Sequence, residues 1–383
     1  ENLDANVPNA VHDMATVRIR NTGDQNLSIT STGISGGWQI VSGGGAGTIA
    51  PGGFRDLTIR FTVTGGAAYE GNLTINSNDP DEPVRRVSLG GFWQSDSESD
   101  PRGRSQEPTL AEIFSVFGYA TAATFGTQSI DTGGNIARVG DEVLSSFWVR
   151  ADGSQPVRVR QLAAFHMQGS TATISYFQRN ATSVVPIVTS AGVDGQSFLP
   201  RKNNQLSAPA TGSFALATST PFGFRVDNVW SEQSRNDLSR GGEGHYMRFY
   251  PVVDRNGQFV ENTWLMAMDY DRILPDYQDN VYLIENMAPF GTPTPPDGLN
   301  GLRSGNRILL DWADNPERAV IGYNVFRSLS PTSGYQQRNS VLVSSSNYTE
   351  STGFAQGTRV YYRVSAVTSD GKESIPASVV VVV

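Results

Sequence analysis

Residues 76–83 read Asn-Ser-Asn-Asp-Pro-Asp-Glu-Pro, and residues 87–91 shortly after them read Val-Ser-Leu-Gly-Gly. Near the other end of the chain, residues 357–367 read Gly-Thr-Arg-Val-Tyr-Tyr-Arg-Val-Ser-Ala-Val. Each segment closes a stretch with the length of one small β-domain. We therefore interpret the chain as a string of β-sandwiches.

The composition agrees with many short strands. A chain of 383 residues predicts two to three domains, and 40 glycines with 20 prolines favour strands and turns over helices. The net charge of −8 argues against nucleic acid as a partner, because phosphate binding needs a basic face. The absence of cysteine excludes disulfides and cysteine metal sites. No apolar run approaches the 18 residues of a membrane span.

Residues 1–94 have the alternating pattern of half-buried strands, which is clearest over Leu57–Val63. Other expected strands are Val17–Arg20, Leu27–Ile29, Leu73–Ile75 and Val84–Leu89. The stretch resembles the Hydin-like immunoglobulin-like repeats of bacterial surface proteins. The matching segments are Asn21–Gly23, Ile49–Gly53, Gly71–Ile75 and Ser77–Pro80.

Residues 95–108 lack apolar side chains and are predicted to be a linker. Immediately after them, Thr109 and Glu112 have the spacing of a capping box. Leu110, Ile113, Phe114 and Phe117 follow with helical spacing, and Gly118 ends the pattern. We expect this one short helix to cover an edge of the middle domain.

Residues 109–288 are predicted to form that middle domain, a larger sandwich of the jelly-roll type. Its expected strands are Val143–Val149, Val157–Phe165, Thr173–Phe177, Phe222–Val226, Met247–Val252, Thr263–Met268 and Val281–Ile284. Its last part, with His245–Pro251, Asp254–Gly257, Trp264–Asp269 and Asp276–Tyr282, resembles domains found beside malectin-like modules in large secreted bacterial proteins. That resemblance implies a setting and not an activity.

Residues 289–296 form a proline-rich second linker. Residues 297–383 resemble a fibronectin type III domain, through Leu309–Trp312, Gly322–Ser328 and Tyr361–Val364. When residues 297–383 are aligned with the fibronectin type III pattern, Val360 occupies the usual position of the tyrosine corner. Tyr361 or Tyr362 is the candidate substitute. The expected fold is therefore all-β, with three tandem sandwiches.

Two catalytic patterns are weak. Gly33–Gly37 matches the string of a serine-hydrolase elbow, but no helical pattern follows it, so we interpret it as a turn. His12, His166 and His245 lie in separate stretches. His166 and His245 could meet inside the middle domain, but we expect structural histidines rather than a metal site.

A calcium site is the first binding hypothesis. Asp269, Asp271, Asp276 and Asp279 form the densest acidic cluster of the chain, and Ca²⁺ prefers such oxygen ligands. Asp254, Asn256 and Gly257 could contribute from an adjacent loop. The alternative is that Asp254–Gly257 forms a hairpin turn and that the other aspartates cap turns.

A carbohydrate site is the second binding hypothesis. Aromatic rings beside acidic and basic side chains can hold sugars by stacking and hydrogen bonding. The exposed loop that begins at Trp230 is the preferred place, with Trp230, Glu232, Arg235, Asp237 and Tyr246 as candidate ligand-binding residues. A paired-carboxylate site from Glu232, Asp237 and Glu243 is also conceivable, but loop acids at such spacings are common.

From these features we expect a non-catalytic segment of a secreted or cell-surface bacterial protein that serves in adhesion or as a scaffold. Its expected partner is a glycan or a protein at the cell surface. The alternatives are a carbohydrate-binding region of a secreted enzyme, and a subunit of a surface filament that self-associates through sheet edges.

Overall fold

The computed structural model describes residues 13–65, 67–94, 107–124, 139–240, 244–270, 276–315, 320–351, 353–369 and 371–383. The chain divides into two compact units. Unit 1 comprises Glu1–Gly118, Phe165–Ser170 and Gly192–Phe198, and unit 2 comprises Tyr119–Ala164, Thr171–Ala191 and Leu199–Val383. Residues 95–106 of the predicted first linker, His12, Glu243 and Asp271 lie outside the described residues.

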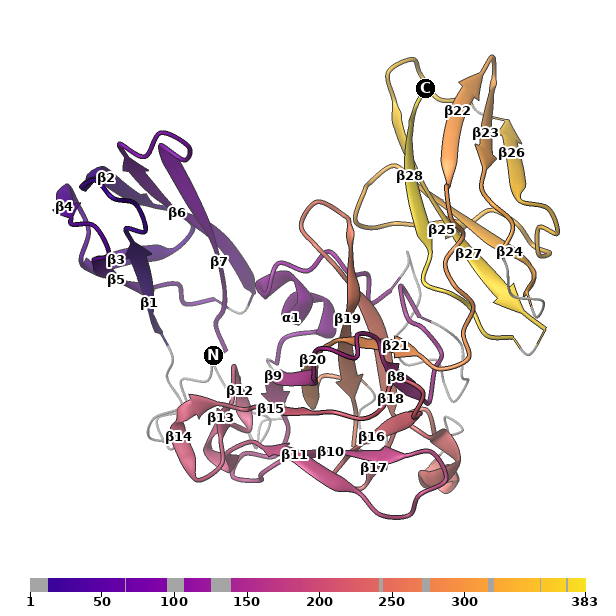
Figure 1. The fold of residues 1–383 in the computed structure, drawn as a ribbon, viewed down its shortest axis with the longest axis horizontal. Coiled ribbons are helices and arrows are strands. Elements are labelled where there is room, and N and C mark those ends of the chain that lie inside the picture. The colour runs from indigo at the N-terminus through magenta and orange to yellow at the C-terminus, as the bar shows by residue number, and fades with distance from the viewer. Residues whose placement is uncertain are drawn as a thin grey trace. The chain divides into compact units, whose positions relative to one another are not determined.

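Unit 1 contains a sandwich of two antiparallel sheets, drawn in indigo to purple (Figure 1). One sheet has the order β1-β5-β3 and the other β4-β2-β6-β7. Alternate residues of the predicted strands face the core, where Leu57 and Leu73 are fully buried. The strands are β1 (Met14–Arg20), β2 (Leu27–Ile34), β3 (Trp38–Ser42), β4 (Gly47–Ile49), β5 (Phe54–Phe61), β6 (Ala68–Ser77) and β7 (Val84–Phe92).

Two polar turns of this sandwich explain its sequence motifs. Asn21 is buried, and its Nδ2 donates to the carbonyls of Gln25 at 2.7 Å and Ile49 at 2.9 Å. In the motif at residues 76–83, Asp79 Oδ1 accepts from the backbone N–H groups of Asp81 and Glu82, both at 2.9 Å. These asparagine and aspartate side chains form hydrogen bonds with backbone groups of the turns that strand pairing leaves without a partner.

The Gly33–Gly37 segment contains the end of β2 and the turn that follows it, so the turn prediction holds for its last three residues. It runs from the end of β2 into β3, and Gly36 and Gly37 have φ values of 76° and 87°. A serine-hydrolase elbow would need a helix at this point.

The predicted capping box is present at the start of α1 (Leu110–Val116). Thr109 Oγ1 accepts from the Glu112 N–H, and Glu112 Oε2 accepts from the Thr109 N–H at 2.9 Å. The expected position of the helix was wrong, because α1 packs against β6 and β7 of the first sandwich. Gly90 permits this contact, since a Cβ there would lie 1.9 Å from the Val116 carbonyl oxygen.

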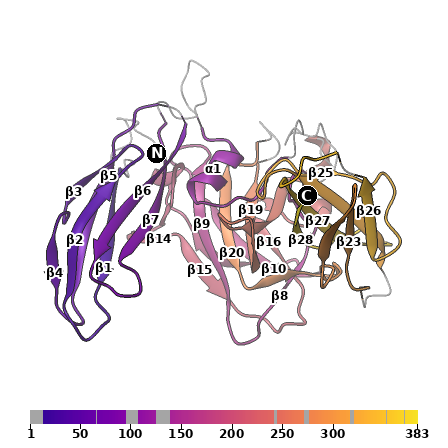
Figure 2. The ribbon, with the colours of Figure 1, turned by 90° about the horizontal axis from the view of Figure 1, so that it is seen from above.

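The middle sandwich consists of two six-stranded sheets (Figure 2). One has the order β11-β10-β16-β8-β21, with β17 on β16, and the other β12-β9-β20-β19-β18, with β15 on β9. The strands are β8 (Trp148–Arg150), β9 (Val157–Phe165), β10 (Thr173–Gln178), β11 (Val185–Thr189), β12 (Gln196–Phe198), β15 (Thr211–Phe214), β16 (Phe222–Val226), β17 (Val229–Trp230), β18 (Met247–Val253), β19 (Phe259–Met268), β20 (Asn280–Glu285) and β21 (Met287–Pro289).

The described residues also form the two-stranded sheet β13-β14 and short 3₁₀ helices, of which η1 belongs to unit 1. Their bounds are β13 (Arg201–Lys202), β14 (Gln205–Pro209), η1 (Gly192–Asp194), η2 (Gln233–Arg235) and η3 (Leu238–Arg240). The expected strand Val143–Val149 was mostly wrong, because only its last two residues lie in β8.

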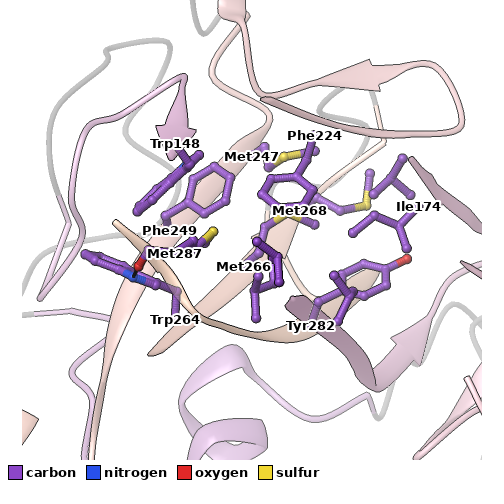
Figure 3. Packing of buried hydrophobic residues seen from close by; sticks show 14 of the residues in the cluster. Trp148, Ile174, Phe224, Met247, Phe249, Trp264, Met266, Met268, Tyr282 and Met287 are labelled. Carbon is purple, nitrogen blue, oxygen red and sulfur yellow. Dashed lines mark hydrogen bonds between the residues drawn. The ribbon is translucent and has the colours of Figure 1, made fainter. Parts of the chain in front are cut away.

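The core of the middle sandwich is rich in aromatic and methionine side chains (Figure 3). The Trp148 ring lies 4.7 Å from the Phe249 ring and 4.6 Å from the Trp264 ring, between centroids. Met266 and Met268 are fully buried beside them. Unbranched methionine fills the irregular gaps that tilted and edge-on aromatic rings leave.

The C-terminal sandwich, in orange and yellow in Figure 1, has three strands in the order β22-β23-β26 and four in the order β25-β24-β27-β28. The strands are β22 (Asn300–Ser304), β23 (Arg307–Asp311), β24 (Val320–Ser328), β25 (Gln336–Gln337), β26 (Asn347–Ser351), β27 (Arg359–Thr368) and β28 (Ala377–Val382). Trp312 is buried in its core, as expected, against Tyr323 at a centroid distance of 5.1 Å.

The tyrosine corner is replaced by a side-chain network. Val360 is fully buried, and the Tyr362 hydroxyl donates to Glu350 Oε2 at 2.8 Å instead of to backbone. Glu350 Oε1 also accepts from Arg327 at 2.6 Å and Arg338 at 2.8 Å. The observed architecture is thus an all-β array of sandwiches. Among the helices described, none combines the length and apolar character that crossing a bilayer requires.

Candidate functional site

The loop that follows β17 is held by Asn236, which is buried. The Trp230 N–H donates to Asn236 Oδ1 at 2.8 Å, and Asn236 Nδ2 donates to the carbonyls of Trp230 at 2.8 Å and Gly244 at 2.7 Å. One amide side chain therefore closes the loop on which four of the five predicted ligand-binding residues lie. Sequence reasoning did not single out Asn236.

Three of those five residues form one cluster. Arg235 Nε lies 2.5 Å from Glu232 Oε2, and its guanidinium carbon lies 4.8 Å from the Trp230 ring centroid. Arg225 lies over the same ring at 4.9 Å. The Phe177 ring meets it edge-on at 5.0 Å. The Trp230 indole is thus packed against two guanidinium groups and a phenyl ring.

The other two predicted ligand-binding residues contact each other. The Tyr246 hydroxyl donates to the Asp237 carbonyl oxygen at 2.5 Å, and the Tyr246 side chain is fully buried. Asp237 Oδ1 accepts from the Ser239 N–H at 2.9 Å and from its hydroxyl at 2.6 Å. Both residues therefore support the shape of the loop.

The described members of the acidic cluster have separate local roles. Asp279 Oδ2 accepts from the Tyr270 N–H at 2.6 Å, and Asp276 Oδ2 accepts from Gln278 Nε2 at 2.8 Å. Burial raises the pKa of Asp276, against the opposing effect of these Gln278 hydrogen bonds. Asp269 is buried.

No three acidic or histidine side chains gather into a metal-binding group in the described parts of the chain. The candidate Asp254 loop forms the predicted hairpin turn, in which Asp254 Oδ1 accepts from the Asn256 and Gln258 N–H groups. Because Asp271 lies outside the described residues, the calcium hypothesis stays a prediction.

A buried ionic cluster surrounds Glu142, which is 0% exposed. His245 Nε2 lies 2.6 Å from Glu142 Oε1, Arg248 Nη1 donates to Oε2, and the Val139 N–H donates to Oε2 at 3.0 Å. Burial alone would raise the pKa of Glu142, but His245 and Arg248 outweigh it and hold that pKa below its ordinary value. The carboxylate is therefore ionised and enclosed.

His245 and Arg248 are themselves held in place. Gln233 Nε2 lies 2.6 Å from His245 Nδ1, and the Arg248 guanidinium carbon lies 4.5 Å from the Tyr277 ring centroid. His166 lies in another environment, where its Nδ1 is 3.2 Å from the Met167 carbonyl oxygen. The cluster lies in the interior of the middle sandwich, where the side chains of Glu142 and Arg248 have almost no exposed surface.

The neighbouring residue, Asp141, joins two sandwiches within unit 2. Its Oδ1 accepts from Nη1 of Arg363 in β27, across 222 residues of sequence, and its Oδ2 accepts from the Ala122 N–H at 2.8 Å. Both charged side chains are only 1% exposed. The Arg363 guanidinium carbon lies 3.9 Å from the Tyr335 ring centroid and 5.1 Å from that of Phe259 in β19.

Sequence reasoning missed this junction. The only local signal is the pair of adjacent acids, Asp141 and Glu142, ahead of an apolar run. Their basic partners lie in two different sandwiches, so no spacing rule could connect them.

No protein-family model matches the sequence, and no curated protein matches it. Among solved structures, a Fn3-like protein from Clostridium thermocellum is 35% identical over 24% of this chain and 93% of its own, with a TM-score of 0.21. The fibronectin type-III domain of human fibronectin type III domain containing protein 3 is 21% identical over 25% and 91%, with a TM-score of 0.20.

Titin module A71 from human cardiac muscle is 22% identical over 25% of this chain and 90% of its own, with a TM-score of 0.20. The resemblances of residues 1–94 and 109–288 to named families stay predictions. The solved structures that match include fibronectin type III-like domains, each of which covers about a quarter of this chain.

Proposed function

We propose that this chain is a non-catalytic segment of a secreted or cell-surface bacterial protein, in which unit 2 holds two β-sandwiches at a fixed spacing. The middle sandwich and the C-terminal sandwich then act together as a rigid scaffold that presents a partner-binding surface, for a glycan or a protein, away from the cell.

The buried Asp141–Arg363 pair carries this proposal. Removing two charges from water costs several kcal/mol for each ion, and the cost is offset only where the geometry is well defined. Arg363 here meets a carboxylate and a ring from the middle sandwich and a ring from its own sandwich. Two sandwiches that moved freely about a linker could not keep the Arg363 guanidinium group shielded from water.

The Glu142 cluster supports the non-catalytic part of the proposal. A general acid or base must lie within hydrogen-bond reach of its substrate. Glu142 is instead enclosed and already bonded to His245, Arg248 and the Val139 N–H. Its pKa is lowered, whereas a catalytic general acid needs a raised pKa.

The resemblances found in the sequence support the cell-surface setting. Hydin-like repeats and malectin-associated domains occur in bacterial surface and secreted proteins, and fibronectin type III domains commonly serve there as spacers. A chain without cysteine suits such a role in bacteria, where secreted proteins are stable without disulfides.

The fixed spacing can be tested by distance measurements between spin labels, because the chain has no native cysteine to compete for the label. Val185→Cys in β11 and Val380→Cys in β28 place one label on each sandwich at exposed positions. The matched control is Val185→Cys with Val260→Cys, which lie in the same sandwich. We expect one distance peak between the sandwiches, as narrow as the control peak.

A broad or multi-peaked distribution between the sandwiches, beside a narrow control, would overturn the scaffold proposal. Hydrolysis of a glycan or peptide substrate by the purified chain would overturn its non-catalytic part.

A further inference from the structure

Unit 2 also contains a cavity of about 580 Å³ beside the junction of its two sandwiches. This volume lies within the range of about 300–1,000 Å³ that is typical of small-molecule sites. Its walls come from β18, β19, β21, the segment after β21, and the segment before β28. The lining includes Phe259, Val260, Glu261, Asn262 and Trp264 of β19, together with five prolines.

One wall is formed by a local irregularity of β19. The β18–β19 ladder pairs Pro251 with Trp264 and then Val253 with Phe259, so residues 260–263 leave the regular register. Asn262 adopts a φ of 52°, in the left-handed region that asparagine tolerates better than most residues. Such bulges re-aim side chains and are common beside functional sites.

The walls are mostly apolar and contain several residues with restricted backbone freedom. Five of the lining residues are prolines, whose φ is fixed, so little backbone freedom is lost when a ligand binds. The Trp264 Nε1–H is already bonded to the Met287 carbonyl oxygen at 2.8 Å. The indole is 1% exposed, so it backs the cavity wall and leaves no unpaired polar atom there.

Glu261 supplies the only ionisable side chain of the lining. It lies on the exposed side of the bulge, and its Oε1 accepts from Asn262 Nδ2 at 3.3 Å. A carboxylate at the edge of an apolar cavity favours a cation and disfavours an anion. The lining thus matches a molecule with an apolar body and a positively charged end.

We propose that this cavity, which we name the β19 bulge pocket, binds a small amine with an aromatic or aliphatic body. The apolar body occupies the proline and aromatic walls, and the ammonium group pairs with Glu261. The site is separate from the scaffold role, which rests on Arg363 and would stand without it.

The test uses three probes that share one ring system and differ in charge: 1-naphthylmethylamine, 1-naphthylmethanol and 1-naphthoate. Their binding to the full chain is followed by ligand-observed NMR at low salt. We expect saturable binding of the amine, and weaker binding of the carboxylate by roughly threefold or more, which an exposed charge contact can supply. The neutral alcohol should fall between them.

Two substitutions locate the site. Val260→Trp places an indole in the pocket wall and should abolish binding of all three probes. Its matched control, Val185→Trp, makes the same change at an exposed position of β11 and should leave binding unchanged. The Glu261→Gln protein should still bind the neutral alcohol, but it should no longer bind the amine more tightly than the carboxylate.

Absence of saturable amine binding, or equal binding to the Val260→Trp protein and the wild type, would overturn the proposal. Equal affinity for amine and carboxylate, or a preference that survives Glu261→Gln, would overturn the assigned ligand class. If either of these results is found while the distribution of spin-label distances between the sandwiches remains narrow, the scaffold proposal stands independently.

Discussion

At the scale of single residues, unit 2 is notable for ionised groups that are buried in pairs. Glu142 with Arg248, and Asp141 with Arg363, each join a carboxylate to a guanidinium group with almost no exposure. A buried pair of this kind adds little net stability over an apolar pair, but removal of one partner leaves an uncompensated charge. These residues should therefore be sensitive to substitution.

Glu142→Gln should destabilise the middle sandwich by about 3–5 kcal/mol, because Arg248 would lose its anionic partner in the core. Urea unfolding followed by tryptophan fluorescence measures this change. The control is Glu82→Gln, which breaks the exposed Glu82–Arg85 pair and should cost less than about 1 kcal/mol. Equal effects of the two substitutions would contradict the role of the Glu142 cluster.

The same residue predicts a pH dependence. His245 and Arg248 outweigh the effect of burial and hold the folded-state pKa of Glu142 below its ordinary value. Its contribution to stability is then fully present above the ordinary pKa and is lost as the pH falls through the lower, folded-state pKa. Wild type should lose more stability than Glu142→Gln when urea unfolding is repeated at acidic pH.

The calcium hypothesis for Asp269, Asp271, Asp276 and Asp279 also belongs to this scale. Binding to the native state alone would add about 2.7 kcal/mol at a hundredfold excess over Kd. The melting temperature should then rise with millimolar calcium and fall with chelator, and Asp276→Asn should abolish the difference. Superimposable melting curves would leave these aspartates as turn-capping groups.

At the scale of elements, α1 illustrates how a helix can be recognised locally while its packing partner is not. The Thr109–Glu112 capping box defines where the helix begins. The packing partner is defined by Gly90 in β7. Because Gly90 has no side chain, the Val116 carbonyl group of the helix can approach the strand closely there. The two features lie in different parts of the sequence.

Gly90→Ala should destabilise unit 1 by about 1–3 kcal/mol, the usual cost of overpacking a close contact. The new methyl group would collide with the Val116 carbonyl oxygen, which is backbone and cannot rotate away. Gly33→Ala is the matched control, since a Cβ in that strand meets nothing within 4 Å. Near-UV circular dichroism during urea unfolding would compare them, and equal stabilities would show that α1 does not depend on Gly90.

At the scale of the whole molecule, the junction inside unit 2 decides whether two sandwiches behave as one body. Asp141 and Arg363 are 222 residues apart in sequence, yet each is the buried partner of the other. A thermodynamic cycle measures this coupling directly, because residues in contact show non-additive effects.

Asp141→Ala, Arg363→Ala and the double variant should give a coupling free energy of about 0.5–3 kcal/mol, from urea unfolding of the full chain. The double variant should be less destabilised than the sum of the single variants, since neither buried charge is then left alone. Strict additivity would mean that the two sandwiches do not stabilise each other through this pair.

The sequence by itself determined features that depend on neighbours along the chain. The strand runs expected at residues 157–165 and 222–226 match β9 and β16 to the residue, and the capping box predicted the start of α1. Turn chemistry likewise predicted a turn at Gly33–Gly37. Alternation, capping and turn formation involve residues a few positions apart, so a sequence pattern carries them fully.

Only the tertiary structure decided the remaining features. Strands of two residues, such as β13 and β17, are too short for a period to show. The packing of α1, the partners of Asp141 and Glu142, and the walls of the β19 bulge pocket all join distant segments. A buried charge or a cavity wall acquires its partner when sheets pack, and no local pattern records which segment that will be.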